Sequence, residues 1–233
     1  MKRILMLAAA AALAASCCFN FTLINKPVRG NGVICEKLYE LPAFNEIKVL
    51  GAMDVEYTQC DSQSVMLRTD ENLQDIYVID VLGDELHVSN EKGVSPIPSK
   101  GSRLFVSNPG IRSVKISGSG DCVIPDELNT DGDFTFSLSG SGDLEAKSII
   151  CNDFTAKISG SGDIEVDALT ADNIVVTING SGDASIGLKD AGDVTVRING
   201  SGDVTLYGNA RTLSHKVNGS GNVNSRQLAL SGE

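Results

Sequence analysis

Five aspartates and one asparagine recur along the second half of the chain at nearly constant spacing. Each closes a five-residue block that reads Ser/Asn-Gly-Ser-Gly-Asp, with Asn replacing Asp in the last copy. Successive closing residues are 22, 20, 20, 20 and 19 positions apart. If the repeats stack, these side chains form one column of evenly spaced oxygen atoms. The column would consist of Asp121, Asp143, Asp163, Asp183, Asp203 and Asn222.

Two kinds of chemistry suit such a column. Carboxylates are ligands that Ca²⁺ prefers, and solenoids with G-G-x-G-x-D repeats bind calcium, although their period is shorter. Alternatively, each side chain accepts backbone N–H groups of its own glycine turn, as in Asx turns. Carboxylates about 4.8 Å apart repel by roughly 0.9 kcal/mol per pair in water, which something must offset. Because Asn222 can also make such turns, we expect the structural role and assign neither a metal nor another cofactor.

Three carboxylates raise the alternative of a polysaccharide-active enzyme. Glu145, Glu165 and Asp167 would lie close together in stacked repeats, and some solenoids cleave polysaccharides with clustered carboxylates. However, no aromatic platform accompanies them, the G-x-S-x-G pattern is absent, and neither histidine has a Ser/Asp partner nearby in sequence. We therefore expect a solvated acidic face without catalytic residues. His215 falls in an inward position of the last repeat and is expected to be a capping or partly buried residue.

The first residues predict export and a lipid anchor. A basic pair precedes an apolar run of about a dozen residues, which is too short to span a bilayer and typical of a secretory signal peptide. Small residues lead directly into Cys17, an arrangement that resembles a bacterial lipobox, although Ala14 stands where leucine is usual. We expect residues 1–16 to be the signal peptide, Cys17 to be acylated (palmitate), and residues 17–34 to form the attachment and tether. An ordinary cleaved signal with an incidental Cys17 is the alternative.

The net charge and the spacing of the cysteines limit the kinds of partner and metal site that we expect. The formal net charge is −11, and loss of the basic pair with the signal leaves 17 basic against 30 acidic residues. Nucleic acids and anionic lipid surfaces require a cationic face, so neither is expected as a partner. The cysteines beyond the signal region stand far apart without a C-x-x-C pair, so structural zinc is not expected either. Export permits disulfides, but three complete pairings remain open for Cys35, Cys60, Cys122 and Cys151.

The residues that flank each block predict β-strands. Apolar side chains alternate with polar ones before a block, as in Phe154, Ala156 and Ile158, and again after it, as in Ile164 and Val166. A period of two indicates a strand with one buried face. Each repeat is therefore a strand, a glycine-rich turn, a second strand and a looser connection.

Two architectures accept this unit: an antiparallel meander of hairpins and a parallel β-helix. A meander does not require neighbouring repeats to match in length or in column. Here they match, because the position four before the closing residue reads Ser, Ser, Ser, Asn, Asn, Asn. We therefore expect a parallel β-helix (solenoid) with coils of about 20 residues over 111–230. The position five before the closing residue gives an inner apolar column of Ile116, Leu138, Ile158, Ile178, Ile198 and Val217.

Residues 35–110 have a related but less regular pattern. Short alternating segments predict strands, Gly83-Asp84 predicts a turn, and residues 70–75 suit one helical turn. We expect an irregular, β-rich N-terminal part of the domain that covers the open end of the first coil. The predicted strands are 47–49, 53–57, 65–68, 76–81 and 86–89.

Three features resemble one known family. Phe44–Val49, the Leu104–Pro109 stretch that runs into Val114–Asp121, and the repeated S/N-G-S-G-D block are similar to the putative auto-transporter adhesin, head GIN domain family of Bacteroidetes-type lipoproteins and secreted proteins. The resemblance spans about residues 45–230. It implies an all-β, right-handed parallel β-helix and an adhesin role, and it supplies no catalytic residues.

Two classes of function therefore lead. The first is an exported cell-envelope lipoprotein, anchored in the outer membrane, that acts as a non-catalytic adhesin-like module and binds a glycan or an envelope or host protein. The second is a structural envelope scaffold or spacer. A polysaccharide-active enzyme is the third alternative. The stretch after Cys17 lacks a run of acidic residues, which favours a periplasmic over a surface-exposed face, but both faces stay open.

Overall fold

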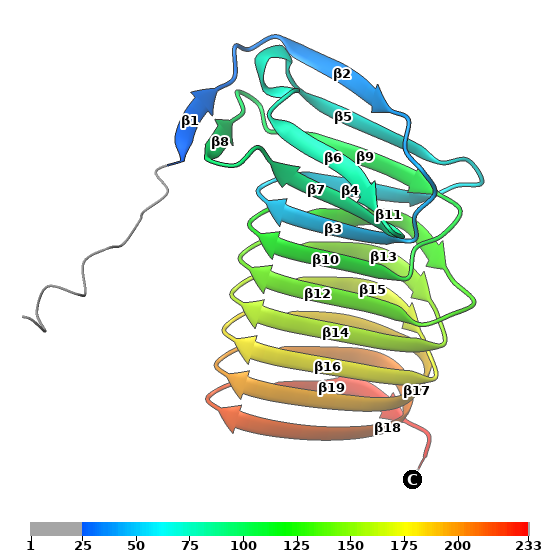
Figure 1. Ribbon diagram of the computed structural model, residues 1–233. Coiled ribbons are helices and arrows are strands. Elements are labelled where there is room, and N and C mark those ends of the chain that lie inside the picture. The colour runs from blue at the N-terminus through cyan, green and yellow to red at the C-terminus, as the bar shows by residue number, and fades with distance from the viewer. Residues whose placement is uncertain (1–24, 233) are drawn as a thin grey trace, which may run out of the picture.

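The computed structural model describes residues 25–232 and consists of a long stack of two-stranded coils with a separate cap at its N-terminal end (Figure 1). In each coil, one strand leads into the glycine turn and one leaves it. The leading strands form what we call the first sheet: β3 (Glu46–Gly51), β10 (Ser113–Gly118), β12 (Phe134–Gly140), β14 (Asp153–Gly160), β16 (Asn173–Gly180) and the second halves of β17 (Ala184–Gly200) and β18 (Val204–Gly219). The leaving strands form the second sheet: β4 (Asp54–Gln59), β11 (Cys122–Asn129), β13 (Leu144–Ile150), β15 (Ile164–Thr170), the first halves of β17 and β18, and β19 (Val223–Leu230).

All coils pair in parallel, and equivalent positions of the repeat lie opposite one another. Ile158 pairs with Leu138 on one side and with Ile178 on the other. The same register continues through Ile198 to Val217. The predicted parallel solenoid is therefore confirmed, and the antiparallel meander is wrong for the repeat region.

The interior consists of aligned aliphatic and aromatic columns. Ile158, Ile178 and Ile198 are each 0% exposed. The rings of Phe134 and Phe154, on neighbouring coils, stack with centroids 6.4 Å apart. Each fully buried side chain contributes about 1.5–3 kcal/mol, but only when a neighbouring coil covers it. Stability therefore arises between coils rather than within one.

A Cβ at either glycine of a block would meet a carbonyl oxygen of the preceding coil, and the first glycine also has a positive φ. Gly140 has a φ of 137°, a region that side chains disfavour. Gly142 has an ordinary φ, but a Cβ there would meet the carbonyl oxygen of Gly120 on the preceding coil. The turns of successive coils are thus in backbone contact, which leaves room only for hydrogen at this position.

The N-terminal cap is built from antiparallel strands, unlike the rest of the molecule. β2 (Ile34–Tyr39) pairs with β5 (Ser64–Asp70), which pairs with β9 (Arg103–Asn108), and β6 (Tyr77–Leu82) pairs with β7 (Glu85–Asn90). β9 and β7 then continue in parallel onto β4 and β3, so the cap joins both sheets. The predicted strands of this part correspond to observed ones, and the predicted helical turn is the 3₁₀ turn Glu71–Leu73. β1 (Lys26–Arg29) and β8 (Val94–Ile97) form a small parallel pair beside the cap.

The regular stack begins one coil earlier than the repeated block suggests. β3 pairs with β10 in the register of the later coils, with Ile47 opposite Val114. The turn of this first coil is Gly51-Ala52-Met53, and it closes with Asp54. Asp54 occupies the position of the repeated aspartates, because its Oδ1 accepts the backbone N–H of Asp121 at 3.2 Å. Residues between β4 and β10 fold as most of the cap and separate the first coil from the second in sequence.

The C-terminal end of the stack has no cap within residues 25–232. Leu213 and Val217 are only partly buried, whereas the equivalent Val194 of the previous coil is 1% exposed. His215 lies opposite Val196, in the inward position predicted for it. It is nevertheless exposed, because no further described coil covers it.

Candidate binding surface

The column of closing residues acts as a ladder of hydrogen bonds between coils. Oδ1 of Asp143 accepts the backbone N–H of Asp163 at 2.8 Å, and Oδ1 of Asp163 accepts that of Asp183 at 2.7 Å. The same contact runs from Asp54 at the top to Asn222 at the bottom. The sequence predicts that each carboxylate binds its own turn, whereas in the structure it binds the turn of the next coil. Each closing aspartate thus binds the backbone of the closing residue in the next coil.

This geometry offsets the repulsion within the ladder. A hydrogen bond to a charged acceptor contributes about 1.5–3 kcal/mol, compared with roughly 0.9 kcal/mol of unscreened repulsion per neighbouring pair. Among residues 25–232, no group of three His, Cys, Asp or Glu side chains has the arrangement of a metal site. The observed contacts of the ladder are hydrogen bonds that join the turn of one coil to the turn of the next.

A second ladder runs beside the first. Nδ2 of Asn199 donates to Oδ1 of Asn179 at 2.9 Å, and Nδ2 of Asn218 donates to Oδ1 of Asn199 at 2.9 Å. Further up the stack the same column continues as Ser117, Ser139 and Ser159, all exposed. The turns therefore present ordered polar groups at a repeat of about 4.8 Å along the solenoid axis.

The structure brings together the three carboxylates considered for catalysis. Glu145 and Glu165 are register partners on β13 and β15, and Asp167 lies two residues along β15. They line a shallow depression of the second sheet together with Lys147 and Pro125. All three carboxylates are exposed, and no histidine lines this depression. The arrangement is that of a solvated acidic face.

The outer face of the first sheet carries a feature that the sequence argument missed. The position six before each closing residue points outward and aligns into one column, which we call the cationic column. Its cations are visible in the sequence only after the repeats are aligned, because Ser137 and Thr177 alternate with them. In chain order the column reads Lys48, Lys115, Ser137, Lys157, Thr177, Arg197 and Lys216, and the first of these lies 3.4 Å from Oε1 of Glu85.

The cap end of this column is neutralised. Nζ of Lys115 lies 2.6 Å from Oε2 of Glu46 and 3.1 Å from Oε2 of Glu85. Arg112 adds a second contact to Glu46, with its Nη2 2.8 Å from Oε1. Hydrogen bonds from Lys115 and Arg112 hold the pKa of the Glu46 carboxyl below its usual range. The cations near the cap are therefore committed to ion pairs within the protein.

The described cysteines are all free thiols. Cys122 and Cys151 lie in the interior, where burial raises the pKa of each thiol to about 12. Cys60 is exposed and Cys35 is half-buried. None of the pairings left open by the sequence occurs among these four residues. Cys17, the predicted lipidation site, lies outside the described residues.

The model of the family described as "putative auto-transporter adhesin, head GIN domain" matches residues 43–168 and 157–231. The chain belongs to this family. The first match begins just before β3, in agreement with the early start of the stack. No curated protein matches the sequence.

Solved structures show that the head GIN domain fold extends to distant sequences. A putative adhesin from Bacteroides fragilis has 18% identity and a TM-score of 0.71, covering 84% of this chain and 99% of its own. A putative lipid binding protein from Parabacteroides distasonis has 20% identity and a TM-score of 0.71, covering 85% and 99%. A putative adhesin from Parabacteroides merdae has 21% identity and a TM-score of 0.53, covering 85% and 98%. These likenesses establish the fold.

Proposed function

We propose that this head GIN domain protein is an exported cell-envelope lipoprotein, anchored through Cys17, whose solenoid is a non-catalytic adhesin-like binding module. One observation carries the binding role: equivalent exposed polar side chains align over successive coils into straight ladders. Such an array holds many hydrogen-bond groups in fixed positions, so little conformational entropy is lost when an extended ligand binds. The family's description as an adhesin supports the same role.

The anchor is supported by the lipobox-like sequence and by the position of the solenoid. Cys17 precedes the described residues by a short segment, so a lipid there would hold the N-terminal cap close to the membrane. No helix within residues 25–232 is long and apolar enough to cross a membrane. Localisation to the outer membrane, on either of its faces, is part of the proposal.

The anchor is tested with the full chain and its Cys17→Ser variant in a diderm bacterium. Metabolic labelling with a palmitate analogue should mark the wild type and not the variant, and only the wild type should partition into the detergent phase. Release of unlabelled wild-type protein from the cells would contradict the anchor. Cys60→Ser is the matched control, because it removes an exposed thiol without touching the lipobox.

The binding role is tested by presenting the purified full chain to arrays of neutral and acidic glycans and to envelope preparations. Retention on a defined glycan or envelope protein supports the module. Retention by none of these ligands would favour the scaffold role instead. Cleavage of a polysaccharide that disappears in the Glu145→Ala/Glu165→Ala/Asp167→Ala variant would overturn the non-catalytic assignment.

A further inference from the structure

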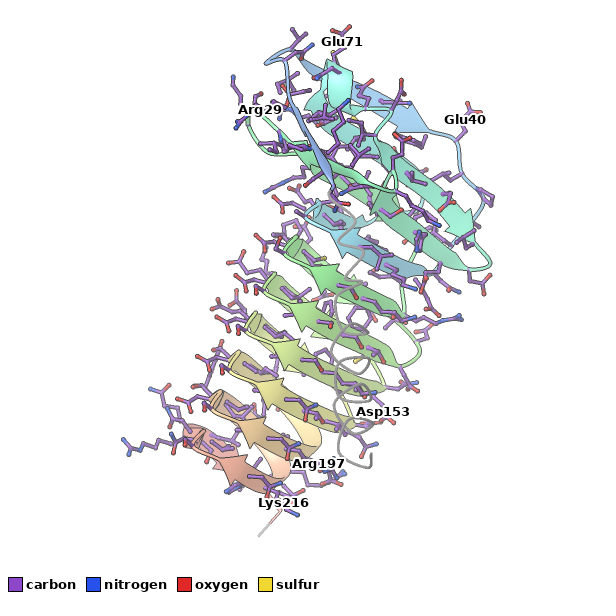
Figure 2. The ribbon with its side chains drawn as sticks, turned by 60° about the vertical axis from the view of Figure 1, so that its left-hand side comes forward. Arg29, Glu40, Glu71, Asp153, Arg197 and Lys216 are labelled. Carbon is purple, nitrogen blue, oxygen red and sulfur yellow. The ribbon has the colours of Figure 1, made fainter. Side chains whose placement is uncertain are left out.

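The lower part of the cationic column differs from its cap end. Lys157, Arg197 and Lys216 are all exposed, and none forms an ion pair within the described chain. Arg197 and Lys216 are register partners on adjacent coils, as Figure 2 shows. Like charges placed directly opposite one another destabilise a sheet. Near the cap, the cations of this column have carboxylate partners that offset such repulsion. The three cations lower in the stack have no such partner among the described residues.

The surroundings of the three cations are polar and uncharged. Hydroxyl and amide side chains occupy the outward columns on both sides, with Val175 as an apolar exception. The nearest carboxylates on these strands are four residues away, about 13 Å along the strand. Of these, Asp193 is neutralised by an arginine, whereas Asp153 is hydrogen-bonded to a neutral amide and keeps its charge. Asp153 accepts from Nδ2 of Asn173 at 2.7 Å, and Asp193 pairs with Arg211 at 2.7 Å. The flanking columns contain Thr135, Thr155, Thr195 and Ser214 on one side and Ser139, Ser159, Asn179, Asn199 and Asn218 on the other.

The spacing of the cations indicates a linear ligand. Lys157 and Arg197 are two coils apart, about 9.6 Å, with the uncharged Thr177 between them. Two sugar residues of an extended polysaccharide have a similar length. We propose that the outer face of the first sheet binds an anionic polysaccharide that lies along the solenoid axis and places acid groups at Lys157 and at the Arg197–Lys216 pair. This inference rests on the proposed binding function and specifies its ligand class and its face.

Other anionic partners fit the face less well. DNA strands present a phosphate every 3.4 Å or so, closer than cations on alternate coils, and single strands also require aromatic stacking platforms. The three outward columns described above contain no aromatic side chain. An anionic membrane would also meet the aspartate ladder beside this face, whose charge opposes binding. A polysaccharide is thin enough to lie on the cationic column alone.

The test compares two variants of equal net charge. Lys157→Gln/Arg197→Gln/Lys216→Gln removes the free cations of the first sheet. Lys147→Gln/Lys189→Gln/Arg226→Gln removes three exposed cations that lie outside this face. Both are made in the full chain, and their melting temperatures are compared with the wild type. The probes are polygalacturonate, its fully methyl-esterified neutral form, and vesicles of phosphatidylglycerol.

The wild type and the second variant should bind polygalacturonate at low salt, release it as salt is added, and ignore the neutral ester. The first variant should bind at least about tenfold more weakly, because three exposed charge contacts are lost together. Equal loss in both variants, no binding by the wild type, or binding to the vesicles alone would overturn the proposal. If the wild type binds neutral glycans and the first variant does so equally, the module stands and only this ligand class fails.

Discussion

The aspartate ladder permits a direct test of what holds successive turns together. Asp163 is the middle member: its Oδ1 accepts the N–H of Asp183, and its own N–H donates to Asp143. Asp163→Ala removes only the first of these contacts, because the second uses the backbone. Asp163→Asn is the matched control, since it keeps an acceptor oxygen and removes the charge.

The expected changes in the free energy of unfolding follow from two opposing contributions: the hydrogen bond that Asp163 accepts and the repulsion from its charged neighbours. The contact to the charged oxygen is worth about 1.5–3 kcal/mol, and its neutral equivalent about 0.5–1.5. Two charged neighbours at about 4.8 Å cost Asp163 roughly 1.8 kcal/mol unscreened, and about half of that at physiological salt. Asp163→Ala should therefore lower the free energy of unfolding by about 0.5–2 kcal/mol at physiological salt. Asp163→Asn should be close to neutral there and become stabilising at low salt.

The assay is urea unfolding of the full chain, followed by far-ultraviolet circular dichroism at two salt concentrations, with and without millimolar Ca²⁺. Because stacked repeats can unfold in stages, the transition should also be followed by a second probe. Equal stability of the alanine and asparagine variants would refute the hydrogen-bond ladder. A large stabilisation of the wild type by Ca²⁺ that both variants lose would show that the column is a cation site.

Three further outcomes are expected. Gly162→Ala should destabilise the stack by about 1–3 kcal/mol or more, because its Cβ would meet a carbonyl oxygen of the preceding coil. Ser161→Ala, at the exposed neighbouring position, is the control and should change the stability little. The urea midpoints of both variants are compared with that of the wild type. Hydrogen bonds, first from the backbone N–H of Ser99, lower the pKa of Asp70, so its contribution is present above the ordinary value of 3.8 and lost as pH falls below it. Asp70→Asn should destabilise the cap at pH 7 and reduce the fall in the free energy of unfolding between neutral and acidic pH. If that fall is unchanged in the variant, groups other than Asp70 cause it. In native protein a thiol reagent should modify Cys60 rapidly and Cys122 only after unfolding, and early loss of the Cys122 thiol would contradict its burial.

The repeat region was predictable because stacking imposes visible constraints on the sequence. Coils that pair in register must have nearly equal lengths, and their inward positions must all be apolar. Ile158, Ile178 and Ile198 satisfy both conditions and are all fully buried. An antiparallel meander would have produced the same alternation but not the same columns. The columns, rather than the alternation, therefore carried the prediction.

The first coil escaped prediction for two physical reasons. Its closing Asp54 is 67 positions from Asp121, because the cap is inserted between them. Its turn also lacks the second glycine, with Met53 in that place. A Cβ at Gly51 would approach only the flexible amide of Asn90 at 3.5 Å, since no glycine turn lies above it. The constraint that creates the block begins only with the second coil, so the first coil does not display it.

The partner of each carboxylate was also beyond sequence reasoning. An Asx turn and a contact to the next coil use the same acceptor and the same kind of donor. Which N–H lies closer depends on the offset between coils, and this offset exists only after stacking. The aspartate column was therefore predicted at the right positions, but its contacts were assigned to the wrong turn.

Net charge is a poor guide to partners in a solenoid. The whole chain carries −11, and that value alone argues against any anionic ligand. Yet a ligand that lies along one face meets only the columns of that face, because charges beyond a Debye length of about 8 Å are largely screened. On the strand of Lys157 the nearest carboxylate is Asp153, four residues or about 13 Å of extended backbone away, which exceeds this length. In a repeat protein of this kind, the quantity that determines electrostatic selectivity is the charge of each column, which alignment of the coils makes readable.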